Sequence, residues 1–216
     1  MLMARTLRST VPHARIVRVD VSPALKIPGV LAAITSEDFV DHGRFGYPIA
    51  DMFMLAYQRV RYAGDGIACV AAENEAALQQ GLEAIVVELE ELPGVFDAMT
   101  ALDPQAPIIG ETPRDASGFP RGNLVTHYIV RKGDAQSELT SCPVILEEDY
   151  STLHQEHAYI ETEGALAIPA PEMSGVTVYA PCQSPFLNRA NLMRTLGLGE
   201  DNVRVIQPHV GGAFGG

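Results

Sequence analysis

The sequence predicts an α+β protein made of two parts. Stretches of alternating apolar and polar residues, typical of half-buried strands, recur along its 216 residues, whereas two longer stretches have the character of helices. Between the two parts, residues 101–123 are dense in proline and glycine, which is typical of an extended connector. We therefore expect one domain at 1–100 and a second at 124–216, joined by this connector.

Strands dominate the first domain. A strand is expected within a few residues of Met1, and residues 14–21 alternate strictly between apolar and polar side chains. Ser36 is placed to begin a helical turn, because its side chain can cap free backbone N–H groups. Further strands are expected at 30–35, 59–62, 66–72 and 85–90.

One amphipathic helix is expected in this domain, from Asn74 to Ala84. Asn74 is a suitable N-cap, and Ala77 and Leu78 lie on the mostly apolar face. Together with the strands at 66–72 and 85–90, this helix indicates a βαβ-type unit.

The second domain is expected to contain strands and one helix. Pro185 lies in the first turn of the predicted helix 185–196, and Gly197 ends it. Strands are expected at 124–131, 143–150, 176–179 and 203–206, while 153–168 is a mixed stretch without a clear period. Strands so close to both chain ends would leave an unpaired sheet edge, so we expect self-association or a complementary subunit.

Composition narrows the class of protein. A net charge of −12 argues against a nucleic-acid surface, which needs clustered Lys and Arg, and 47% hydrophobic residues indicate a globular chain. The apolar stretches are short for a membrane span, and the start has no pattern of a signal peptide. Cys69, Cys142 and Cys182 are widely spaced and form no CxxC pair, which fits reduced thiols in a cytoplasmic protein.

The glycine-rich stretch 210–216 is the first candidate site. Four glycines surround Phe214, and glycine lets a large rigid ligand touch the main chain. The dinucleotide and P-loop glycine motifs do not fit this stretch, and a flexible turn is the simpler alternative.

Two further stretches could carry chemistry. Residues 154–163 hold two histidines and three carboxylates, but His154 and His157 are three apart rather than the four of a zinc H-E-x-x-H motif. The alternative is a polar, partly buried segment.

Cys182 and Gln183 open the helix at 185–196. Free N–H groups at the start of a helix suit an anion or oxo group, and they could also activate Cys182 as a nucleophile.

The order of short motifs along the chain resembles the molybdenum-binding subunit of the xanthine dehydrogenase and aldehyde oxidase family. The resemblance covers essentially the whole chain. Its motifs are RSTVPHARI at 8–16, PGV at 28–30, VRYAGD at 60–65, GD at 133–134, QEHAYIE at 155–161, Gln183, and VRVI at 203–206 leading into GGAFGG at 211–216. The chain departs from the family at Asp65-Gly66, where Glu-Pro is more usual, and at Cys182, where Thr or Ser is common.

The resemblance implies an α/β-hammerhead domain at 1–100 and the first part of a molybdopterin-binding domain at 124–216. It also implies a molybdenum hydroxylase that oxidises an aromatic heterocycle or an aldehyde with water-derived oxygen. By the same resemblance, Gln183 and Phe214 lie near molybdenum without ligating it, and the cofactor contacts are Gln183, Gly212, Ala213, Phe214 and Gly215.

The family's catalytic base, a glutamate, lies beyond the position of Gly216, so we expect no catalytic residue and no hydroxylase activity in this chain alone. The resemblance implies partners: the remaining part of the molybdenum subunit, an iron–sulfur subunit and an FAD subunit. A non-catalytic remnant or assembly module that keeps the fold for protein contacts is the alternative.

Overall fold

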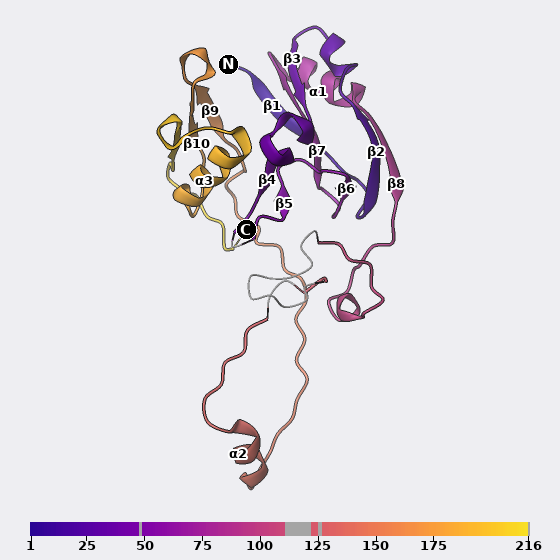
Figure 1. Cartoon of the computed structure of the whole chain (residues 1–216), viewed down its shortest axis with the longest axis vertical. Helices are drawn as coiled ribbons and strands as arrows, with labels where there is room; N and C mark the ends of the chain where they lie inside the picture. Colours follow the sequence, from indigo (N-terminus) through magenta and orange to yellow (C-terminus); the bar gives the residue numbers. More distant parts are fainter. Residues whose placement is uncertain (48, 111–121, 125–126, 216) are drawn as a thin grey trace.

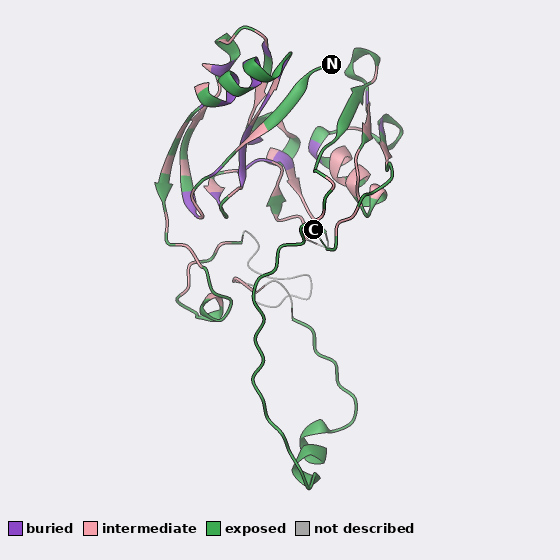
Figure 2. Cartoon of the chain, turned by 180° about the vertical axis from the view of Figure 1, so that it is seen from behind, coloured by how far each residue is buried: buried purple, intermediate pink, exposed green. Residues whose placement is uncertain are grey.

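The computed structural model describes residues 1–47, 49–110, 122–124 and 127–215. Two bodies of strands and helices lie side by side, and an arm formed by residues 127–153 extends away from both (Figure 1). Buried residues gather in the strands and helix of the first body, whereas the arm is exposed along its whole length (Figure 2). The structure confirms the α+β class.

The first body contains two three-stranded antiparallel sheets and a short ribbon. One sheet has the order β1-β7-β3, with β1 (Met3–Arg8), β7 (Gly66–Ala72) and β3 (Val30–Ile34). The other has the order β6-β2-β8, with β6 (Arg59–Val60), β2 (Ala14–Asp20) and β8 (Val86–Glu91). The ribbon pairs β4 (Arg44–Phe45) with β5 (Met52–Phe53). Short 3-10 turns occur at η1 (Ala24–Lys26), η2 (Ser36–Asp38) and η3 (Val40–Gly43).

Helix α1 (Glu75–Ala84) covers β7 and supplies one of the two apolar clusters in the core of this body. Leu78 is 1% exposed and packs in one apolar cluster with Val70 of β7. At Gly81 a Cβ would lie only 2.9 Å from a methyl of Val30 and 3.0 Å from one of Val70, so glycine lets the helix approach the sheet closely.

The predicted βαβ-type unit is wrong. β7 pairs with β1 and β3, whereas β8 pairs with β2, so α1 connects two different sheets. A βαβ unit needs two parallel strands of one sheet, and all described pairings in this body are antiparallel. Helix and strand patterns in sequence reveal the elements but not which sheet each strand joins.

Asn74 begins α1 as expected: its Oδ1 accepts the backbone N–H of Ala77 at 3.0 Å. Replacing Asn74 by alanine is expected to lower the free energy of unfolding by about 1 kcal/mol, because one N–H of the first turn loses its acceptor. Urea denaturation followed by circular dichroism measures this change. Asn74→Asp is the control, since its carboxylate can accept the same N–H; equal losses in both variants would contradict a capping role.

Two of the motifs noted in the sequence contact each other. The backbone N–H of Ser9 donates to the Asp65 carbonyl, and that of Gly64 donates to the Ser9 carbonyl, both at 2.8 Å. The Asp65 side chain is buried, accepts the N–H of Arg61 at 3.1 Å, and has its pKa raised by burial. The segments 8–16 and 60–65 therefore brace one turn of the first body.

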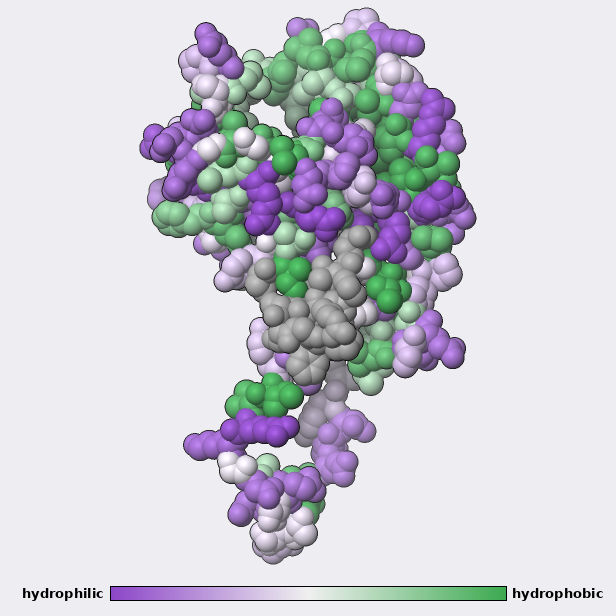
Figure 3. All heavy atoms as spheres, viewed as in Figure 1, coloured by the Kyte–Doolittle hydropathy of each residue, from purple (hydrophilic) through white to green (hydrophobic). Residues whose placement is uncertain are grey.

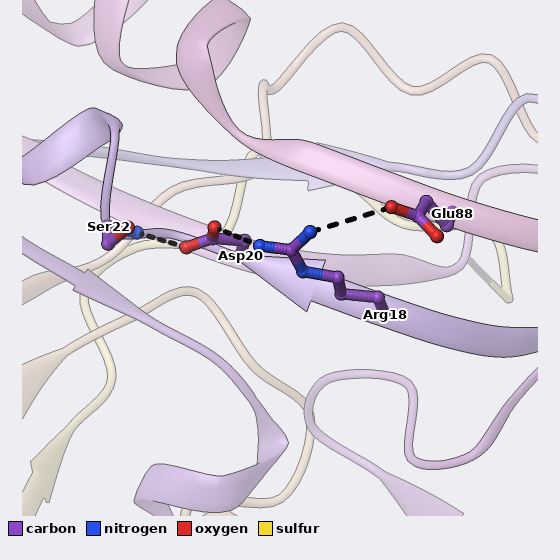
Figure 4. A network of polar contacts seen from close by, with 4 residues as sticks. All are labelled: Arg18, Asp20, Ser22 and Glu88. Atoms are coloured by element: carbon purple, nitrogen blue, oxygen red, sulfur yellow. Dashed lines mark hydrogen bonds and ion pairs between the residues drawn. The ribbon is translucent and has the colours of Figure 1, made fainter.

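A polar network links β2 to β8 near the end of β2 (Figure 4). Arg18 Nη2 lies 2.7 Å from Asp20 Oδ2, and Arg18 Nη1 lies 3.7 Å from Glu88 Oε1. Ser22 donates its backbone N–H to Asp20 Oδ1 at 2.9 Å. Hydrogen bonding from Ser22, more than the charge of Arg18, holds the pKa of the Asp20 carboxyl below its usual value.

The second body is a three-stranded sheet with the order β11-β10-β9. Its strands are β9 (Leu166–Pro169), β10 (Val176–Tyr179) and β11 (Val203–Ile206). β9 and β10 form an antiparallel hairpin through η5 (Pro171–Met173), whereas β10 and β11 run parallel and are joined by α3 (Pro185–Leu196) and η6 (Glu200–Asn202). The strands at 176–179 and 203–206 are confirmed, and β9 was not predicted.

Helix α3 begins and ends where the sequence predicts. Pro185 is in its first turn, and Gly197 ends it in the left-handed conformation with a φ of 67°. Arg189 donates from Nε to the Val203 carbonyl at 2.8 Å, which ties the helix to the start of β11. The chain thus makes its parallel crossover in the second body rather than the first.

The arm replaces two predicted strands. Residues 127–131 and 143–150 belong to no strand, and 125–126 lie outside the described residues. Their apolar side chains are exposed, including Val130 at 94% and Leu146 at 88%, and Figure 3 shows apolar side chains on the visible face of the arm. The predictions at 124–131 and 143–150 are wrong in this chain, because alternation alone makes no strand without a neighbouring strand.

Helix α2 (Ala135–Ser141) at the tip of the arm was not predicted; Asp134 caps it by accepting the N–H of Ser137 at 3.1 Å. In the connector, residues 111–121 lie outside the described residues, and η4 (Thr100–Leu102) is a short turn. Asn123 Nδ2 donates to the Pro107 carbonyl at 2.9 Å, which folds the described ends of the connector together.

In the described ranges, no helix has the length and apolar character needed to cross a membrane.

Candidate cofactor-binding site

Two segments that the sequence singles out follow parallel strands. Cys182 and Gln183 come shortly after β10, and the glycine loop, residues 210–215, comes shortly after β11. The carboxyl ends of parallel strands meet at one edge of a sheet, and ligands of α/β proteins bind outside such edges. The local βαβ arrangement therefore brings the two segments to one place.

A small cavity of about 60 Å³ joins these segments to a third. Its lining comes from three parts of the chain: Tyr159, Glu161, Thr162 and Glu163; Pro181 and Cys182; and Val210, Gly212 and Ala213. The three candidate stretches of the sequence thus meet at one point, although they are far apart in the chain: fifty positions separate Glu161 from Gly211, which it contacts.

The glycine loop has a backbone that other residues rarely adopt. Gly212 has a φ of 138° and Gly215 a φ of 101°, both in the region that favours glycine. Gly212 and Ala213 are half-buried, whereas the Phe214 side chain is 79% exposed. A Cβ on Gly212 would lie 3.5 Å from the Phe214 ring, so the aromatic ring folds back over the loop.

Residues 157–163, which we name the wall segment, run alongside this loop. His157 Nε2 lies 3.4 Å from the position of a Cβ on Gly215, and Tyr159 Cβ lies 3.9 Å from that of a Cβ on Gly212. Farther along, Glu161 Oε2 accepts the backbone N–H of Gly211. Every second residue from His157 to Glu161 therefore faces the loop, in the opposite chain direction.

A phenol–carboxylate pair continues the same face. Tyr159 donates its hydroxyl to Glu163 Oε1 at 2.8 Å. This hydrogen bond is the main cause that raises the pKa of the Tyr159 phenol, because the carboxylate already accepts the proton that ionisation would remove.

Gln183 lies at the start of α3 with its side chain exposed. The next residue, Ser184, is the N-cap of α3, but its side chain makes no capping hydrogen bond. The preceding residue, Cys182, is half-buried and lines the cavity as a free thiol. Gln183 does not itself line the cavity, but it directly follows Cys182, which does, and it is exposed.

The described residues do not support the zinc interpretation of 154–163. No group of three or more His, Cys, Asp or Glu that could hold a metal ion occurs in the part of the chain that the structure describes. His154 and His157 belong to no helix, and His157 faces Gly215 instead. All three cysteines are free.

Comparisons with known proteins agree with this arrangement. A family model described as the aldehyde oxidase and xanthine dehydrogenase a/b hammerhead domain matches residues 1–103, and one described as a molybdopterin cofactor-binding domain matches residues 119–216. A probable xanthine dehydrogenase subunit of Bacillus subtilis is 37% identical over the whole chain, which spans 28% of that relative's length. The nicotinate dehydrogenase large molybdopterin subunit of Eubacterium barkeri is 36% identical, and the chain spans 48% of it.

A solved structure shares the fold of both bodies. The aldehyde oxidoreductase of Desulfovibrio gigas superposes with a TM-score of 0.82 at 26% identity, over 99% of this chain and 24% of the other. The two family matches, the similarity over the whole of this chain and the shared architecture lead to one conclusion. The chain belongs to the aldehyde oxidase and xanthine dehydrogenase family of molybdopterin proteins.

Proposed function

We propose that the chain forms the first part of the molybdopterin site of a molybdenum hydroxylase that oxidises an aromatic heterocycle or an aldehyde. The observation that carries this proposal is the meeting of the glycine loop, the residues Pro181 and Cys182 before α3, and the wall segment outside the parallel strands β10 and β11. In this proposal residues 1–100 are the hammerhead domain, 101–123 the connector, and 124–216 a partial cofactor-binding domain.

The residues at this edge fit a large rigid cofactor with oxo groups. Gly212 and Gly215 hold conformations in which the main chain can approach a ligand closely, since no side chain shields it. Ala213 adds only a methyl group, and the exposed Phe214 ring can form a wall of the substrate channel. The Gln183 amide can donate a hydrogen bond to an oxo group, beside helix N–H groups that favour negative charge.

When bound, the molybdenum cofactor would supply the two-electron oxidation, and this chain would bind and orient it. The proposal places the general base outside residues 1–216, so the chain alone would have no hydroxylase activity. Its relatives are named as a xanthine dehydrogenase subunit and a large molybdopterin subunit, which supports an assembly with other subunits. The partners that we propose are the rest of a molybdenum subunit, an iron–sulfur subunit and an FAD subunit. Its free thiols favour a reducing compartment, the cytoplasm.

Metal and pterin analysis of the native protein, with the intact mass of this polypeptide, tests the proposal. Molybdenum and pterin in the purified assembly are the expected result. A mass above 23.2 kDa would place these residues in a longer subunit, and a mass near 23.2 kDa with a second chain would show a divided one. An assembly without molybdenum and pterin would contradict the proposal and leave a non-catalytic assembly module.

Gln183→Ala is expected to lower turnover by about 100-fold while the assembly keeps its molybdenum, because one donor to the reacting centre is lost. Steady-state kinetics and metal content on the same preparation measure both effects. Gln80→Ala, an exposed glutamine of α1, is the matched control. Unchanged turnover in Gln183→Ala would remove Gln183 from the site.

A further inference from the structure

We infer that Glu161 is a positioning residue, whose carboxylate holds the glycine loop in the shape that faces the cofactor. The inference rests on the proposed function, because the loop matters only if it contacts a ligand. The juxtaposition that carries it is the Glu161 carboxylate against the backbone N–H of Gly211.

The contact between the two residues is direct and charge-assisted. Gly211 donates its N–H to Glu161 Oε2, and a hydrogen bond to an ionised acceptor is about twice as strong as one between neutral groups. Glu161 is half-buried and also lines the cavity beside the loop. The carboxylate therefore fixes the main chain where the loop begins, close to the end of β11.

Glycine at position 211 is explained by this contact. A Cβ there would lie 3.1 Å from Glu161 Cβ and 3.2 Å from its Oε2, so a larger residue would push the carboxylate away. Gly211 is not among the glycines with positive φ, unlike Gly212 and Gly215. The requirement at 211 is therefore for space, whereas at 212 and 215 it is for backbone conformation.

Three residues of the wall segment, His157, Tyr159 and Glu161, face the glycine loop, but they contact it in different ways. His157 and Tyr159 lie at van der Waals distance from the positions that a Cβ on Gly215 and a Cβ on Gly212 would take, and such proximity is not directional. The hydrogen bond of Glu161 is directional, so it sets the register between wall segment and loop. A shift of this register would move Gly212 and Phe214 relative to the start of α3.

The test compares Glu161→Ala and Glu161→Gln in the native assembly. The first readout is amide hydrogen exchange of the peptide that contains Gly211, and the second is molybdenum and pterin content. Glu161→Ala is expected to raise the rate of amide hydrogen exchange at Gly211 about tenfold, because the N–H loses a hydrogen bond to a charged group. Glu161→Gln is expected to restore most of the protection, because the amide oxygen can accept the same N–H.

Glu172→Ala serves as the control, since Glu172 is an exposed carboxylate of the same body. Unchanged exchange in Glu161→Ala, or equal loosening in Glu161→Gln, would overturn the inference even if the assembly contains molybdenum. The proposed function fails separately: wild-type protein without molybdenum and pterin would contradict it even if exchange responds as expected.

Discussion

Replacing Gly212 by valine is expected to reduce the molybdenum and pterin content of the native assembly at least about tenfold. Gly212 has a φ of 138°, and a β-branched residue held in such a conformation costs roughly 1–3 kcal/mol, which the loop would relieve by changing its path. The new side chain would also start 3.5 Å from the Phe214 ring and 3.9 Å from Tyr159 Cβ, on the face that is proposed to meet the cofactor.

Gly133→Val is the matched control for this variant. Gly133 also has a positive φ, 67°, but lies in the exposed arm, where a Cβ added to it would have no atom within 4 Å. Metal analysis and pterin fluorescence, normalised to the amount of folded chain, measure occupancy. Full occupancy in Gly212→Val with unchanged circular dichroism would show that the glycine loop does not face the cofactor.

The sequence predicts best those helices and strands that are determined by residues within the element or next to it. Helix α1 begins at the Asn74 cap, and helix α3 lies between Pro185 and the left-handed Gly197. Each of these residues acts within one turn of its own helix, so the pattern is complete in a short window. The strand at 66–72 is likewise found because it is a continuous apolar run.

Strand pairing is where sequence patterns are insufficient. Residues 143–150 have the alternation of a strand but lie in the exposed arm, whereas the unpredicted β9 forms because β10 lies beside it. A strand needs hydrogen bonds to the backbone of a neighbouring strand, and that strand can lie far away in the sequence. For the same reason the sequence could not tell that β7 and β8 belong to different sheets.

The candidate site shows the same division. The glycine loop and Gln183 are found from residue type and motif, but the contact of Glu161 with Gly211 spans fifty positions and is visible only in the structure. A pattern that could have indicated it is the period-two spacing of His157, Tyr159 and Glu161, although Ala158 between them has a φ of 51°, so the segment is not a regular strand. In the first body, by contrast, the motif residues Ser9 and Asp65 brace a turn, so their role is structural.

Leu78→Ala is expected to lower the free energy of unfolding of the first body by about 2–5 kcal/mol. Leu78 is 1% exposed on the face of α1 that packs against β7, and its cluster joins α1 to both outer strands of that sheet through Val30 and Leu7. Truncation removes buried methyl groups and leaves a cavity that the closely packed helix, held near the sheet by Gly81, can close only in part.

The matched control is Leu31→Ala, the same change at a side chain that is 56% exposed on β3. Its expected cost is within about 0.5 kcal/mol, since few buried contacts are lost. Urea denaturation followed by circular dichroism gives both values, and amide exchange of the β7 peptide reports on the first body alone. If both variants lost equal stability, the α1–β7 cluster would contribute little to the core, and the second apolar cluster, which packs Ile67 of β7 against Ala14 of β2 and Val60 of β6, would have to hold the two sheets together.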